Sequence, residues 1–114
     1  MNTTVDKPWG YYVDFDQGDN WKAKRIEISP DARFSLQSHG YRDEVWVVVS
    51  GVAYVSVNDF RKRMGEGEII RIKARDWHRA QAGPEGCTII EVQLGVCDER
   101  DITRKEDDYG RACD

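Results

Sequence analysis

Residues 36–51, LQSHGYRDEVWVVVSG, join a polar half to a hydrophobic half that begins at Val45. The second half is rich in valine and contains a tryptophan, and both residue types favour a β-strand. The polar half contains His39, one of the chain's two histidines, with the amide of Gln37 and the carboxylate of Glu44 close to it. A strand region that carries these three side chains so close together indicates a binding site as well as a sheet.

Short strand-like segments lie on both sides of this stretch. Residues 21–28 alternate so that Ile26 and Ile28 share one face. Ser50-Gly51 separates two β-branched runs, which predicts a hairpin there. Strands spaced about eight to twelve residues apart predict an all-β sandwich or barrel. The expected strands are residues 21–28, 45–49, 52–57, 60–64, 69–72 and 87–95, with turns at 58–59, 65–68 and 83–86, and only the tail at 98–111 could hold a helical turn.

Length and composition indicate one globular domain over residues 1–114. The chain is 39% hydrophobic and 33% charged, which suits a folded protein and not a disordered one. A domain this short buries a limited core, and its N-terminal residues 7–15 are apolar enough to cover a partner. We therefore expect a homodimer.

Charge, hydropathy and cysteine usage exclude several other classes. The net charge is −4 with both signs mixed, so nothing indicates a nucleic-acid partner. No apolar run approaches the roughly 20 residues of a membrane span, and the N-terminus lacks the apolar core of a signal peptide. Cys87, Cys97 and Cys113 are odd in number and have no CxxC spacing, so we expect free thiols. These features predict a cytoplasmic protein with no membrane association.

Four polar side chains could converge on one point of such a sheet. Residues two apart on a strand share a face, so Gln37 and His39 point the same way. Glu44 lies on the next strand, and His78 ends a later one. Nitrogen and oxygen donors of this kind suit zinc, manganese, iron or nickel. The alternative is that both histidines are ordinary core or surface residues with satisfied hydrogen bonds.

Two spaced motifs carry a family resemblance. The first is Gln37-x-His39, then four residues, Glu44, six residues and Gly51. The second is Gly67, five residues, Lys73-Ala74-Arg75, two residues and His78. Both resemble the paired motifs of the cupin superfamily, with histidines in both ligand positions.

The resemblance is closer to one group of cupins. KPWGYY, WKAKRIEISP, FSLQSHGYRDEVWVVVSGVA, GCTIIEVQLG and DITRKEDDYGR together resemble the cupin domain of type II mannose-6-phosphate isomerases, over about residues 7–111. The resemblance implies a cupin barrel (a double-stranded β-helix, or jelly roll) and a sugar-phosphate substrate. It also implies that one divalent metal, zinc first and manganese, iron or nickel otherwise, is held by Gln37, His39, Glu44 and His78.

The chain departs from this family's usual residues without removing a ligand. Gly40, Tyr41 and Val45 stand where the family usually has histidines. Lys73 and Arg75 replace the proline and glycine of the second motif. Metal binding is therefore expected, whereas these positions bear on which sugar phosphate binds and on whether isomerase turnover is retained.

An isomerase of this kind also needs a base and a phosphate site. Lys24, which shares a face with Ile26, and Glu91 are the catalytic candidates. The face of Glu91 stays open, because Ile90 and Val92 compete to be the buried set. Arg42, kept from the family motif, and its neighbour Tyr41 are the substrate-binding candidates. Other cations near the motifs are Arg71, Lys73, Arg75 and Arg79, each of which could equally be a solvated strand residue.

Three functions follow, each from a different class. The first is a metal-dependent mannose-6-phosphate isomerase that acts in carbohydrate or polysaccharide metabolism. The second is a metal-bearing cupin that binds a sugar or sugar nucleotide without isomerase turnover. The third is a cupin without catalysis that serves a polysaccharide pathway as a structural or regulatory partner. Metal content separates the third from the others, and turnover separates the first from the second.

Overall fold

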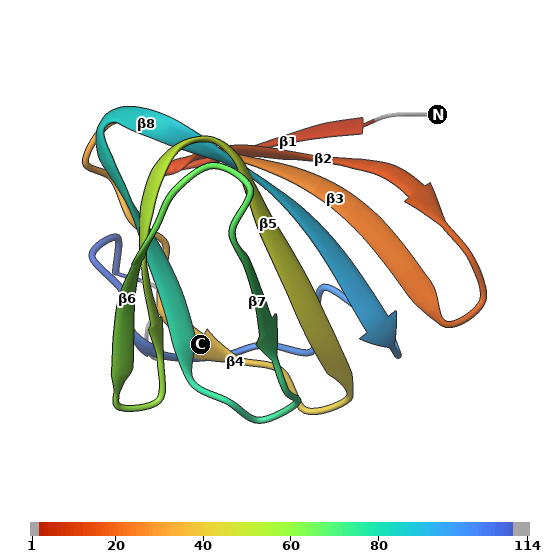
Figure 1. Cartoon of the computed structure of the whole chain (residues 1–114). Helices are drawn as coiled ribbons and strands as arrows, with labels where there is room; N and C mark the ends of the chain where they lie inside the picture. Colours follow the sequence, from red (N-terminus) through yellow and green to blue (C-terminus); the bar gives the residue numbers. More distant parts are fainter. Residues whose placement is uncertain (1–2, 111–114) are drawn as a thin grey trace.

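Residues 3–110, the part of the chain that the structure describes, form nine β-strands and no helix in the computed structural model (Figure 1). This part of the chain therefore supplies no helical segment long and apolar enough to cross a membrane. The all-β class predicted from the spacing of short strands is confirmed. The strands are β1 (Thr3–Lys7), β2 (Gly10–Gln17), β3 (Trp21–Ile28), β4 (Leu36–Ser38), β5 (Arg42–Val57), β6 (Phe60–Met64), β7 (Ile69–Ile72), β8 (His78–Gly95) and β9 (Thr103–Glu106).

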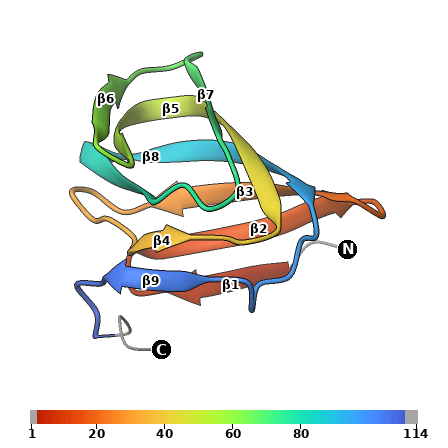
Figure 2. The same cartoon turned by 90° about the horizontal axis from the view of Figure 1, so that it is seen from below.

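Strand β8 is the centre of the sheet. It pairs antiparallel with β3, β4 and β5. The sheet continues from β3 through β2 to β1 and from β4 to β9, while β5 also pairs with β6 and β7. The whole sheet curls so that its strands surround one interior (Figure 2). The inward-facing residues of β3, β5 and β8 consequently face a common space.

The hairpin predicted at Ser50-Gly51 is wrong, because β5 runs without a break through both residues. Its register with β8 shifts between Val48 and Ser50 and again between Gly51 and Ala53. Such bulges bend a strand sharply without ending it. Gly51 has φ +77°, and a Cβ there would lie 2.3 Å from the carbonyl oxygen of Gly86, so the bend requires glycine.

The turn predicted at residues 83–86, GPEG, is also wrong. These residues lie within β8, where they form the bulged side of the pairing with β5. Cys87 pairs with Gly51 and Ala82 with Ala53, so four residues of β8 stand opposite the single residue Val52. Glycine and proline are typical of turns and of bulges alike, which is why the sequence did not distinguish them.

The two ends of the chain are more regular than the sequence predicted. The helical turn expected in the tail is wrong for the described residues, because 103–106 form β9 and pair with β4. Cys113 and residue 111 lie outside the described part. At the other end, β1 and β2 form a hairpin that extends the sheet beyond β3, and the sequence predicted neither strand.

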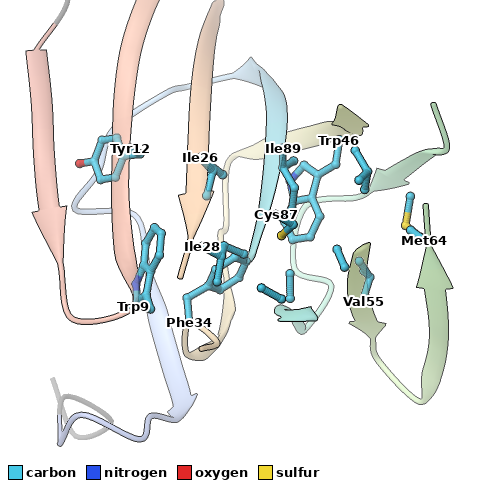
Figure 3. Packing of buried hydrophobic residues seen from close by; sticks show 14 of the residues in the cluster. Trp9, Tyr12, Ile26, Ile28, Phe34, Trp46, Val55, Met64, Cys87 and Ile89 are labelled. Carbon is cyan, nitrogen blue, oxygen red and sulfur yellow. The ribbon is translucent and has the colours of Figure 1, made fainter. Parts of the chain in front are cut away.

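The inner face of β5 carries both core and polar residues. Arg42, Glu44, Trp46 and Val48 are all buried, while the residues between them are only partly buried. Trp46 packs edge-on against Phe34, with ring centroids 5.8 Å apart (Figure 3). The inner face of β5 therefore passes from the charged residues Arg42 and Glu44 to the apolar residues Trp46 and Val48.

The apolar N-terminal residues serve this chain's own core. Trp9 and Tyr12 belong to the buried cluster, and the Trp9 ring lies 5.5 Å from that of Phe34 (Figure 3). Among the large apolar side chains of that segment, only Phe15 is exposed. The argument for a homodimer from this apolar segment therefore no longer applies, and the dimer stays a prediction.

Candidate metal centre

Three side chains from distant parts of the chain meet inside the barrel. Glu44 comes from β5, His78 opens β8, and His39 follows β4. Their ligand atoms all lie within 4.8 Å of one another. The Nε2 of His39 is 3.3 Å from Glu44 Oε2, and the Nε2 of His78 is 3.6 Å from Glu44 Oε1. All three side chains are at most 5% exposed, so the group is almost fully buried.

Backbone carbonyls set the tautomer of both histidines. The Nδ1 of His39 donates to the carbonyl of Asp101 at 2.7 Å, and the Nδ1 of His78 donates to that of Asp76 at 2.9 Å. A carbonyl can only accept, so each Nδ1 carries the hydrogen and each Nε2 presents a lone pair. In metal sites, a hydrogen bond from the ring nitrogen that does not bind the metal usually orients the imidazole in this way.

Burial keeps both imidazoles neutral at pH 7. It lowers the pKa of His39 to about 4, with the charge of Arg42 as the next cause. Burial also lowers the pKa of His78. The Nε2 of His78 is a buried nitrogen with no hydrogen-bond partner, and it faces the Glu44 carboxylate. An orphaned lone pair beside a buried carboxylate fits a divalent cation.

The fourth residue predicted as a ligand, Gln37, lies in the same place. It stands directly opposite His78 in the β4–β8 pair, so the two side chains are on one face. Gln37 also lines the pocket together with His39 and Glu44, and its Oε1 accepts a hydrogen bond from Ser35 Oγ at 3.3 Å. The structure thus brings all four predicted residues together, and their role as ligands stays a prediction.

Glu91 faces inward. Ile89, Glu91 and Gln93 are buried, whereas Ile90 and Val92 are only partly buried, which answers the question that the sequence left open. Burial, together with the neighbouring charge of Glu44, raises the pKa of Glu91 to about 7. Gln93 Nε2 donates to its carboxyl at 2.7 Å. Glu91 can therefore gain or lose a proton near neutral pH.

Lys24 lies directly across from Glu91 in the β3–β8 pair. Its ammonium is 3.0 Å from Glu99 Oε2 and 4.0 Å from the centre of the Tyr12 ring. Burial alone lowers the pKa of Lys24, but the charges of Glu91 and Glu99 outweigh it and the pKa is raised. Lys24 is therefore a cation at pH 7 and cannot act as a base there.

Of the predicted ligands and catalytic candidates, all but His78 line one pocket of about 560 Å³, its open mouth included. Arg42 lines it and is 5% exposed, whereas Tyr41 is 69% exposed and is not part of the lining. The other cations considered near the motifs do not line the pocket either. Several residues that line the pocket were not predicted as site residues from the sequence. Two of them, Lys7 and Arg104, lie within stretches that carried the family resemblance. The lining residues that were not predicted include Lys7, Tyr12, Glu99 and Arg104.

The fold defines the chain as a cupin. An RmlC-like cupin from Shewanella frigidimarina superposes with a TM-score of 0.79 at 19% identity, covering 88% of this chain and 89% of that one. Oxalate decarboxylase from Bacillus subtilis gives 0.82 at 21% identity, covering 90% of this chain and 30% of that one. At these identities the likeness concerns the fold alone, and it confirms the predicted cupin barrel.

The chain belongs to the family described as mannose-6-phosphate isomerase C-terminal, which matches residues 1–107. It is 40% identical over 113 residues to mannose-1-phosphate guanylyltransferase ManC of Salmonella typhimurium, covering 97% of this chain and 24% of that protein. It is 42% identical over 112 residues to the alginate biosynthesis protein AlgA of Pseudomonas aeruginosa, covering 96% and 23%. The xanthan biosynthesis protein XanB of Xanthomonas campestris is 41% identical over 109 residues, covering 94% and 23%. The chain thus spans about a quarter of the length of these relatives.

Proposed function

We propose that this chain is a metal-dependent sugar-phosphate isomerase that interconverts mannose 6-phosphate and fructose 6-phosphate. One observation supports this most directly. Glu91, a buried carboxyl whose pKa is raised by that burial, lines the same pocket as His39 and Glu44. A carboxyl of that pKa beside a set of metal-binding donors is what proton transfer between two sugar carbons requires.

In this proposal Glu91 moves the proton. An aldose becomes a ketose when a proton leaves the carbon beside the carbonyl and is returned to the carbonyl carbon, while the hydroxyl proton of the first carbon moves to the former carbonyl oxygen. As a carboxylate Glu91 accepts the proton from the first carbon, and as a carboxylic acid it gives that proton to the carbonyl carbon. A divalent cation held by Gln37, His39, Glu44 and His78 would supply Lewis-acid stabilisation of the charge that develops on the sugar oxygens.

The cations of the pocket are proposed to bind the phosphate. Lys7, Lys24, Arg42 and Arg104 line it together with only three carboxylates, one of which is Glu91 with its raised pKa. Ammonium and guanidinium groups recognise phosphate oxygens through charge-assisted hydrogen bonds. Lys24 is proposed as a residue that binds substrate, since it stays protonated, and the base is assigned to Glu91.

The test is an isomerase assay on metal-loaded protein. Purified protein is loaded in turn with zinc, manganese, iron and nickel and incubated with mannose 6-phosphate, and fructose 6-phosphate is measured. Glu91→Gln should lower kcat by at least about 100-fold. Glu85→Gln, at an exposed position outside this pocket, is the control and should keep the parent rate.

Two results would contradict the proposal. Full activity in Glu91→Gln would remove Glu91 from the reaction. Metal-loaded parent that binds mannose 6-phosphate without turnover would favour the alternative of a sugar-binding cupin.

We further propose that the protein acts as a homodimer in the cytoplasm. Val49, Ile69 and Leu94 are among the exposed apolar side chains, and they belong to strands β5, β7 and β8. Exposed apolar side chains of this kind gain from burial against a second copy. Light scattering at micromolar concentration should give twice the mass of one chain, and a monomer would contradict the dimer.

A further inference from the structure

The guanidinium of Arg42 contacts two of the proposed ligand atoms. Its Nε donates to Glu44 Oε2 at 3.0 Å, and its Nη2 lies 3.2 Å from His39 Nε2. A guanidinium has no acceptor, and the Nδ1 of His39 already carries the ring's hydrogen, so Nη2 donates to the lone pair of Nε2. The side chain of Arg42 is 3% exposed, which holds it in this position.

The hydrogen bond to His39 uses a lone pair that a metal would need, whereas the one to Glu44 occupies only part of a carboxylate oxygen. The Nε2 of His39 has one lone pair, and Arg42 occupies it. Of the two imidazoles, only that of His78 offers a free Nε2 lone pair, while Glu44 also accepts a hydrogen bond from Trp46 Nε1 at 3.0 Å and keeps further lone pairs on its carboxylate. A cation that binds all three residues must therefore displace at least the contact between Arg42 and His39.

Arg42 makes a third contact, with the chain that follows β8. Its Nη1 donates to the carbonyl of Asp98 at 3.3 Å, in the segment between β8 and β9. Glu99, the next residue, lies against Lys24 at the same pocket. The guanidinium thus contacts both the proposed metal ligands and the segment that carries Glu99, the ion-pair partner of Lys24. Lys24 is one of the pocket cations proposed to bind the anion.

We propose that Arg42 is a positioning residue that couples metal binding to anion binding. While Arg42 is hydrogen-bonded to His39 and Glu44, it opposes metal binding. When the metal displaces Arg42, its guanidinium becomes available to a tetrahedral dianion such as a phosphate group. Linkage requires the reverse as well, so an anion that engages Arg42 strengthens metal binding by the same factor. This inference rests on the metal site of the proposed function but does not depend on isomerase turnover.

The geometry requires arginine in particular. The fork of a guanidinium reaches a carboxylate oxygen and an imidazole nitrogen at the same time, whereas an ammonium is a single point donor. Arg42→Lys keeps the charge and loses the fork. If Arg42 opposes the metal by occupying the lone pairs, both Arg42→Lys and Arg42→Gln should bind the metal more tightly. If it acts only by repulsion between two cations, Arg42→Lys should behave like the parent.

The experiment is a titration with Co²⁺, followed by its visible absorption, in chloride and in sulfate at equal ionic strength. In chloride, Arg42→Gln should bind Co²⁺ roughly ten- to a hundredfold more tightly than the parent, because hydrogen bonds to charged groups have about that weight. Arg42→Lys should also bind more tightly than the parent. Sulfate should tighten Co²⁺ binding about fivefold or more in the parent and have little effect in Arg42→Gln.

Two controls accompany the titration. Arg63→Gln, at an exposed position on β6, makes the same change of net charge and should leave Co²⁺ affinity unchanged. Circular dichroism establishes that each variant is folded. The chain has only two histidines, so the imidazole nitrogen NMR signals of metal-free protein provide a second readout. Arg42→Gln should shift the Nε2 signal of His39 far more than that of His78.

Several results would overturn the coupling. Equal or weaker Co²⁺ binding by folded Arg42→Gln would show that Arg42 does not oppose the metal. Tighter Co²⁺ binding by Arg42→Gln with no change in Arg42→Lys would mean that Arg42 opposes the metal only through its positive charge. An equal sulfate effect in parent and Arg42→Gln would assign the anion to another residue. If parent and variants all fail to bind Co²⁺, the metal site fails, and both proposals fail with it.

Discussion

Lys24 and Glu91 stand opposite each other across β3 and β8, yet Lys24 forms its ion pair with Glu99. The carboxyl of Glu91 instead accepts a hydrogen bond from Gln93 and lies near the charge of Glu44. Burial and that neighbouring charge raise its pKa to about 7, and the opposing effect of Lys24 does not cancel them. The folded protein therefore holds a proton that the unfolded chain would release.

This proton makes stability depend on pH in a defined direction. The pKa of Glu91 is about 7 in the folded protein and 4.5 for an ordinary glutamate. Its contribution to the free energy of unfolding is full below pH 4.5 and is lost as the pH rises through 7. Glu91→Gln lacks this titration. Between pH 4.5 and pH 8 the metal-free parent should lose up to about 3 kcal/mol relative to Glu91→Gln.

Denaturant unfolding of both proteins at several pH values measures this difference. The lowered pKa of His39 acts in the opposite direction, since its contribution is present above pH 6.5 and is lost as the pH falls toward 4. That contribution is shared by parent and variant, so it cancels to first order in the comparison. A difference that stays constant from pH 4.5 to pH 8 would show that Glu91 has an ordinary pKa.

Replacing His78 by alanine should remove the metal and keep the fold. The change deletes the one ligand atom without a hydrogen-bond partner. Metal affinity should fall by more than the roughly 10- to 100-fold that results from replacing a residue that only hydrogen-bonds to a ligand. His78→Ala loses an edge-on contact with Trp46, but the apolar core around Val55 and Ile89 contains none of the proposed ligands, so the fold should survive. Metal content and circular dichroism, measured beside the parent, test this, and stoichiometric metal in the folded variant would exclude His78 as a ligand.

Alternation along single strands made part of the site predictable from sequence. Glu44 shares a face with Trp46 on β5, and Lys24 shares one with Ile26 on β3, as the period of two requires. The proximity of Gln37 and His78 depends on the pairing of β4 with β8, which joins residues far apart in the chain. Only the motif spacing and the family resemblance indicated it.

The contribution of the segment after β8 was beyond local sequence signals. Glu99 and Asp101 belong to a connection without periodicity, and they meet the site only because β9 returns to pair with β4. The contacts of Arg42 were also unpredictable, because strand alternation gives a face and not a hydrogen-bond partner. Propensity likewise could not show that Ser50-Gly51 bends a continuous strand, since the same residues suit a turn.

Asp101 should be a positioning residue for His39. Its carboxylate accepts hydrogen bonds from the backbone N–H groups of Gly40 and Tyr41 at 2.7 and 3.0 Å, and its carbonyl accepts from His39 Nδ1. Asp101→Ala frees this segment and the ring with it. Metal affinity should fall roughly 10- to 100-fold, and the free energy of unfolding should fall by about 1–3 kcal/mol.

Two further variants test this role of Asp101. Asp101→Asn keeps one acceptor oxygen and should lie between the parent and Asp101→Ala in both measurements. Asp108→Ala breaks an exposed ion pair with Arg33 and should leave metal affinity unchanged, with a stability change within about 1 kcal/mol. Parent-like metal affinity in Asp101→Ala would contradict the positioning role.

The glycines that end the first motif and open the second should differ in how much they stabilise the fold. Gly51 and Gly67 both have positive φ, +77° and +86°. A Cβ at Gly67 would meet nothing within 4 Å, so Gly67→Ala adds only backbone strain of about 1 kcal/mol. A Cβ at Gly51 would lie 2.3 Å from the carbonyl oxygen of Gly86, in the bulged pairing of β5 with β8. Gly51→Ala should therefore destabilise the protein by at least about 3 kcal/mol. Thermal unfolding of both variants beside the parent measures the difference, and equal shifts in Tm would mean that the bulge relaxes to accept a side chain.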